Sequence, residues 1–169
     1  MTIPGLKDSS LFVRKAFIGG DWSDAATGAT LLVDNPSSGR ILGTVPNCEL
    51  AETNAAIAAA EKAFKTWRAT TAVDRSALLE RWYALILENA ADLSRIMTAE
   101  QGKPLPEAEA EVRYGASFIK WFAEEAKRVG GNTVPAPTTD RRIIVLKEPV
   151  GVSAAITPWN FPNAMITRK

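Results

Sequence analysis

One stretch, residues 150–169 (VGVSAAITPWNFPNAMITRK), constrains the fold more than any other part of the sequence. Its first seven residues alternate between larger apolar and small side chains, which is the two-residue period of a β-strand. Two prolines then bracket a short turn. The second, Pro162, suits the first turn of a helix, because its missing N–H costs nothing there. We therefore predict a strand over residues 150–156, a stiff turn, and a helix start capped by Asn160 or Phe161.

The predicted turn is a candidate site. In open α/β sheets, ligands bind where the carboxyl end of a strand faces the N-terminus of a helix. Asn160 lies at this point, and its amide offers two N–H donors that suit a developing oxyanion. By spacing alone, an asparagine here is more often a helix cap or turn residue, and Trp159 is more often core filler than a cofactor wall. The residues themselves leave both interpretations open.

Three motifs together resemble landmarks of the NAD(P)-dependent aldehyde dehydrogenase family: FIGGDW, EQGKP and TPWNFP, at residues 17–22, 100–104 and 157–162. The similarity runs in family order from about residue 11 onward and is greatest to succinate-semialdehyde dehydrogenases. It implies an incomplete α/β fold, in which residues 1–169 are the helix-rich N-terminal part of a doubly wound cofactor-binding domain with a small antiparallel strand unit. It also implies that residues 141–149 form a strand of the oligomerisation arm.

The resemblance further implies a function for the parent enzyme, which would oxidise succinate semialdehyde to succinate with NAD or NADP through a cysteine thiohemiacetal. Asn160 matches the oxyanion-hole asparagine of the family. Arg168 matches the arginine associated with the distal carboxylate of the substrate. The residues that match the segment lining the cofactor cleft are Ile156, Thr157, Pro158 and Trp159. The nucleophilic cysteine and the general-base glutamate of the family have no counterpart here, so we expect this chain to be inactive alone.

Composition limits the other function classes. The 20 basic and 19 acidic residues give a net charge of +1, which argues against nucleic acid or an anionic membrane as a partner. There is no histidine and a single cysteine, Cys48, so we predict neither a Cys/His metal site nor an internal disulfide. No run of 18 apolar residues and no leader-like segment occurs, so we expect a cytoplasmic protein. The family resemblance implies that the parent enzyme is a homo-oligomer.

Hydrophobic spacing and turn residues predict the other elements. We expect a loose arm over residues 1–10, a Gly-Gly hairpin over 12–22 and a second strand pair over 31–34 and 41–45. Four helices follow, over residues 50–68, 74–88, 89–100 and 106–128. A Gly/Pro-rich connector over 129–137 then leads to a strand over 142–148. Three glutamates, Glu107, Glu109 and Glu111, crowd the start of the fourth helix. We interpret them as a solvated helix start rather than as metal ligands.

Two alternatives to succinate-semialdehyde oxidation stay open. The first is a dehydrogenase for another carboxylated semialdehyde, such as glutarate semialdehyde, because only Arg168 of the substrate pocket is seen here. The second is a non-catalytic helical module that pairs with full-length subunits, which an exposed strand edge and uncovered helix faces would favour. The nucleotide sequence after Lys169 separates the enzyme from the module.

Overall fold

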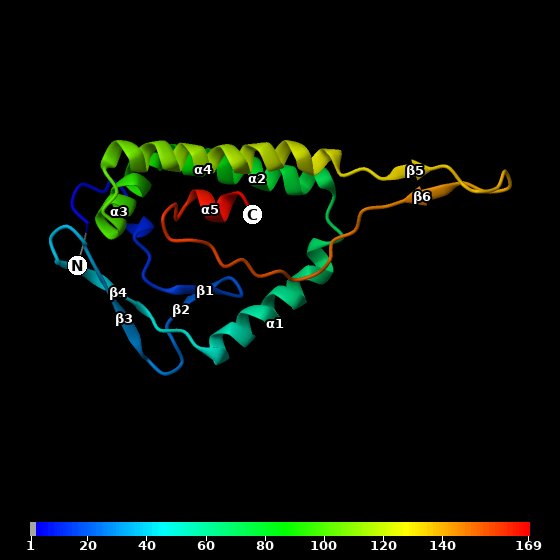
Figure 1. Cartoon of the computed structure of the whole chain (residues 1–169). Coiled ribbons are helices and arrows are strands. Elements are labelled where there is room, and N and C mark those ends of the chain that lie inside the picture. Colours follow the sequence, from blue (N-terminus) through cyan, green and yellow to red (C-terminus); the bar gives the residue numbers. More distant parts are fainter. Residues whose placement is uncertain (1–2) are drawn as a thin grey trace.

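Four long helices make up most of the regular secondary structure, and three of them pack together into its core (Figure 1). The computed structural model describes residues 3–169. The four helices are α1 (Leu50–Trp67), α2 (Ala72–Glu88), α3 (Ala90–Gln101) and α4 (Leu105–Glu125), and a short 3₁₀ turn, η2 (Ala126–Arg128), continues α4. Helices α2 and α3 pack on α4 along a row of small and β-branched side chains. The row consists of Ala108, Val112, Ala116, Ile119 and Ala123.

The four predicted helices are confirmed, with small shifts at their ends. Helix α2 begins two residues earlier than predicted, because the Thr71 hydroxyl accepts a hydrogen bond from the Asp74 N–H at 3.1 Å and caps the first turn. Helix α3 ends at Gly102, whose φ of 78° lies in the left-handed region that glycine adopts at low cost. None of the helices in residues 3–169 is both long and apolar enough to cross a membrane.

Both predicted strand pairs near the N-terminus are confirmed. Strands β1 (Ala16–Ile18) and β2 (Asp21–Ser23) form an antiparallel hairpin, and β3 (Thr30–Asp34) pairs with β4 (Ile41–Pro46). The β1–β2 turn is Gly19-Gly20, with φ values of 64° and 102° that a two-residue hairpin turn needs. These pairs form because their partners are close in sequence and their turns carry suitable residues.

The loose arm predicted over residues 1–10 is wrong where the structure describes it; residues 1 and 2 lie outside the described residues. Ile3 is buried, and a 3₁₀ turn, η1 (Ser9–Leu11), follows. The backbone N–H groups of Lys7 and Asp8 donate to the buried carboxylate of Asp92 on α3 at 2.8–3.0 Å. A carboxylate that satisfies two backbone donors fixes the segment in place.

The connector predicted over residues 129–137 contains a strand that its Gly/Pro content concealed. Strand β5 (Asn132–Val134) pairs antiparallel with β6 (Ile143–Val145), so β6 covers only part of the strand predicted over 142–148. The β5–β6 hairpin extends away from the helices, at the right of Figure 1, and its strand residues are all exposed.

The strand predicted over residues 150–156 is not formed. This segment is irregular, with Val150 97% and Ile156 100% exposed. A strand needs a neighbour for its backbone N–H and C=O groups, and no strand lies alongside within residues 3–169. The helix predicted after Pro162 is present as the short α5 (Ala164–Thr167), but its N-cap is Asn163 rather than Asn160 or Phe161. Helix α5 packs against α4 (Figure 1).

Candidate active-site turn

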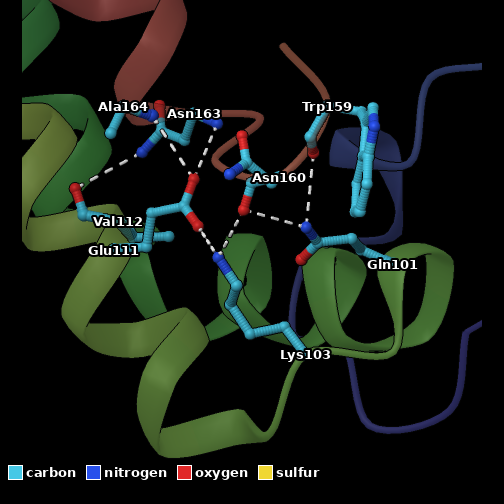
Figure 2. A network of polar contacts seen from close by, with 8 residues as sticks. All are labelled: Gln101, Lys103, Glu111, Val112, Trp159, Asn160, Asn163 and Ala164. Carbon is cyan, nitrogen blue, oxygen red and sulfur yellow. Dashed lines mark hydrogen bonds and ion pairs between the residues drawn. The ribbon is translucent and has the colours of Figure 1, made fainter.

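The Asn160 turn, residues 157–163, lies against the end of α3 and the first half of α4 (Figure 2). The Gln101 side chain donates through Nε2 to the carbonyl oxygens of Trp159 and Asn160 at 3.3 and 3.1 Å. The Lys103 ammonium donates to the same Asn160 carbonyl at 3.0 Å. Two side chains of the EQGKP motif therefore hold the backbone of the TPWNFP motif, almost sixty residues later in the sequence.

A buried ion pair lies directly beneath this turn. The Lys103 ammonium pairs with the Glu111 carboxylate, and their side chains are only 11% and 1% exposed. The other oxygen of Glu111, Oε1, accepts hydrogen bonds from the backbone N–H groups of Asn163 and Ala164, at 3.0 and 3.4 Å. One carboxylate thus satisfies both the lysine and the first free N–H groups of α5, as a buried charge requires.

The side chain of Asn160 is left free by these contacts. Asn160 is exposed, and within residues 3–169 its amide group has no hydrogen-bond partner, so only its backbone is held. A hollow of about 480 Å³ opens beside it. The hollow is lined by Lys103, Glu107, Ala110, Glu111, Tyr114, Asn160 and Phe161. The turn therefore fixes the asparagine backbone while the amide donors stay available to a ligand.

The segment expected to line a cofactor cleft is largely exposed. Ile156 and Pro158 are exposed, Thr157 is half-buried, and the Trp159 ring is 81% exposed, so Trp159 does not fill the core. Three of these side chains, Ile156, Pro158 and Trp159, fit the wall of a nicotinamide cofactor site in one respect: they are apolar and exposed, so the core does not use them. A flat ring stacked on such a surface would bury apolar area on both partners.

Arg168 follows the last residue of α5 and is exposed. Its guanidinium carbon lies 5.6 Å from the centroid of the Phe118 ring on α4, and no carboxylate within residues 3–169 pairs with it. Helix α5 is too short to join Arg168 to Asn160 by the two regular turns that their spacing suggested. Stacking on an aromatic ring fixes the guanidinium and leaves its N–H donors for an anion.

Comparison with protein-family models matches residues 22–169 to the description "Aldehyde dehydrogenase family". The chain belongs to the aldehyde dehydrogenase family. A glutarate-semialdehyde dehydrogenase of Pseudomonas putida is 59% identical over 97% of this chain and 34% of its own length. An NADP(+) succinate-semialdehyde dehydrogenase of Escherichia coli K12 is 55% identical over the same shares.

Solved structures agree with this assignment. A succinate-semialdehyde dehydrogenase from Burkholderia pseudomallei has a TM-score of 0.95 and 55% identity, covering 98% of this chain and 34% of that one. The chain thus spans about a third of the length of the aldehyde dehydrogenases that it matches. The family resemblance and the α/β fold class predicted from the motifs are confirmed.

The residues that sequence reasoning missed belong to the support of the turn. Gln101 and Lys103 were seen as part of a motif, without a role. Glu111 was interpreted as a solvated residue, and this is wrong, although its neighbours Glu107 and Glu109 are exposed. A pattern was available: Glu111 follows the buried Ala108 by three residues and precedes the buried Gly115 by four, so it lies on the packed face of α4.

Other candidate groups do not join the site. Cys48 is a free, exposed cysteine in the segment between β4 and α1, away from the Asn160 turn. Within residues 3–169, no three acidic or thiol side chains gather closely enough to hold a metal ion. The candidate residues that remain are Asn160, Arg168 and the segment 156–159.

Proposed function

We propose that this chain is the N-terminal part of an aldehyde dehydrogenase that oxidises succinate semialdehyde to succinate with NAD or NADP. The observation that carries the proposal is the state of Asn160, whose backbone is held by Gln101 and Lys103 while its amide stays unpaired. Family membership and the succinate-semialdehyde relatives support the same reaction. The nucleophile and general base would come from residues outside this chain, which would be inactive alone.

In the proposed reaction, Asn160 donates hydrogen bonds to the aldehyde oxygen as negative charge develops on it. Because the Asn160 backbone is held, only the side chain has to orient its amide when the charge appears, and donors that need little reorganisation lower reaction barriers. Three side chains of this segment, Ile156, Pro158 and Trp159, would hold the cofactor through their exposed apolar surface. A bound nicotinamide supplies the hydride acceptor. This chain contributes orientation and charge stabilisation rather than the covalent step.

Arg168 is proposed to bind the carboxylate at the far end of the semialdehyde. A guanidinium presents paired N–H donors that match the two oxygens of a carboxylate. The Phe118 ring beneath it limits the directions that the guanidinium can take. Selection of substrates with a distal anion would follow from this single contact.

The role of Asn160 can be tested in a chimera in which this chain replaces the matched 164 residues of the E. coli enzyme. We expect N160A to lower kcat by about 10²–10³-fold, the usual loss when one oxyanion donor is removed. The measurement is NADPH formation from succinate semialdehyde, with circular dichroism to confirm folding. A folded N160A chimera with unchanged kcat would refute the proposal.

The role of Arg168 is separable from that of Asn160. In the chimera we expect R168M to raise KM for succinate semialdehyde and to lower kcat/KM by about 10- to 100-fold, as loss of hydrogen bonds to a charged group does. Propanal, which has no carboxylate, serves as the matched substrate, and its kcat/KM should stay within about twofold. An equal loss for both aldehydes would contradict a carboxylate contact.

Glutarate semialdehyde is the second candidate substrate, because the P. putida relative that bears its name is 59% identical to this chain. The two semialdehydes differ by one methylene, for which a pocket discriminates only about 10- to 200-fold. The test is to measure the ratio of kcat/KM for the two semialdehydes in the chimera and in the E. coli enzyme. A difference between the two ratios shows which semialdehyde the residues of this chain favour.

A further inference from the structure

We infer that Lys103 and Glu111 are positioning residues for the proposed oxyanion donor: they hold the Asn160 turn so that its amide faces the reacting oxygen. The inference rests on the function proposed for Asn160. Its starting point is that the turn has little packing of its own, since Trp159 and Phe161 are both exposed. Polar contacts from α3, α4 and the segment between them must therefore hold it.

The two charged groups hold the turn at Asn160 and at the start of α5 (Figure 2). The Lys103 ammonium contacts the Asn160 carbonyl at 3.0 Å and lies 4.1 Å from the centroid of the Phe161 ring. At the start of α5, Glu111 accepts hydrogen bonds from the backbone N–H groups of Asn163 and Ala164. Because Lys103 and Glu111 also form an ion pair, the contacts that they make with the turn are coupled.

Loss of charge at Glu111 would release the Lys103 contact and weaken the contact to α5. A glutamine has nearly the same shape and can still accept from the α5 N–H groups, but it leaves the buried Lys103 ammonium without its counter-charge. An unpaired charge in a buried position is strongly unfavourable. The lysine would therefore turn toward solvent and leave the Asn160 carbonyl. A shift of about 1 Å in a catalytic group can cost about 10²-fold in rate.

A double-mutant cycle in the chimera distinguishes a positioning role of Lys103 and Glu111 from a purely structural one. We expect E111Q, and independently K103M, to lower kcat by about 10- to 100-fold while KM for succinate semialdehyde changes by less than about threefold. In the N160A background the same substitutions should lower kcat by less than about twofold, because the group that they position is gone.

The matched control is K120M. Lys120 is also an ion-paired lysine packed on α4, with its Nζ 2.7 Å from a carboxylate oxygen of Glu80, but its side chain is 41% exposed and it makes no contact with the turn. We expect its kcat to stay within about twofold of the parent chimera, as for other exposed pairs of small energetic effect.

Amide hydrogen exchange supplies a measurement independent of activity. E111Q and K103M should speed exchange at Asn163 and Ala164, whereas K120M should not. The inference is overturned if E111Q and K103M leave kcat unchanged, or if they lower kcat equally with and without Asn160. An N160A chimera with unchanged kcat would instead refute the proposed function, and the positioning role with it. If E111Q does not fold, the kcat and exchange measurements on K103M alone decide whether the inference holds.

Discussion

Asp92 is a single carboxylate that ties the N-terminal segment to α3. Hydrogen bonds from the backbone N–H groups of Asp8 and Lys7, the former the stronger influence, hold the pKa of Asp92 below its ordinary value of 3.8. Since the folded-state pKa is the lower one, the resulting stabilisation is complete above the unfolded value. It is lost as the pH falls through the folded-state pKa.

This linkage predicts an acid-sensitive attachment of residues 3–12. In the chimera, pepsin should leave the Leu11–Phe12 bond intact near pH 4.5 and cut it increasingly as the pH falls below 3.8. D92N should be cut across the whole range, because a neutral amide binds the two N–H groups more weakly. D24N is the control, since Asp24 pairs with Lys15 on the exposed surface. Equal resistance of D92N and the parent near pH 4.5 would contradict the prediction.

Residues at this scale also show what a sequence can reveal. Asn160 was found because two prolines mark its turn, and its proposed role came from the motif. Glu111 was missed because three glutamates at alternate positions suggest a solvated face. Only the turn formed by residues more than fifty positions later makes one of them a buried anchor. Local spacing can place Glu111 on the packed face of α4, but it does not show which distant groups the carboxylate binds.

At the scale of elements, local features were predictable and distant pairings were not. The β1–β2 hairpin carries its own turn in Gly19-Gly20, and the helices carry their own apolar spacing. In contrast, the alternation over residues 150–156 suits a strand that has no neighbour within the described residues. Strand β5 forms in a Gly/Pro-rich segment because β6 supplies its partner. Pairing partners, more than propensity, decided both cases.

The β5–β6 hairpin allows a test of the proposed oligomerisation arm with adjacent glycines. A Cβ at Gly131 would overlap the Val145 carbonyl oxygen, whereas one at Gly130 would meet nothing within 4 Å. We expect G131A to open the end of the hairpin, costing about 1–3 kcal/mol as overpacking does, and to raise the dissociation constant of the chimera oligomer about tenfold. G130A should leave it unchanged.

Hydrogen exchange over residues 132–134 and 143–145 and sedimentation velocity check this pair of variants. Faster exchange in G131A with an unchanged oligomer would show that the hairpin has no part in assembly. Unchanged exchange would show that the backbone relieves the overlap at little cost. Exposed apolar side chains on the hairpin, such as Ile144 and Leu146, are the surface that a second subunit would cover.

At the scale of the whole molecule, the chain exposes far more surface than its mass requires. Its accessible surface is 11887 Å², whereas a compact monomer of 18.2 kDa exposes about 8,100 Å² by the usual scaling. Helix α1 has no buried residue, and its apolar side chains Ile57 and Trp67 are exposed. The sequence therefore indicates which faces need cover, but nothing in residues 3–169 supplies that cover.

The excess surface leads to the last prediction, which concerns the 169-residue chain purified by itself. With faces of α1, the segment 150–156 and the β5–β6 hairpin uncovered, it should bind a hydrophobic dye and self-associate, while the folded chimera should not. It should also give no NADH or NADPH from succinate semialdehyde, since the roles proposed for Asn160 and Arg168 do not include that of the nucleophile. The measurement is cofactor fluorescence against a heat-killed control. A clear burst would contradict the division of labour proposed here, and inactivity combined with tight binding to full-length subunits would favour the non-catalytic module instead.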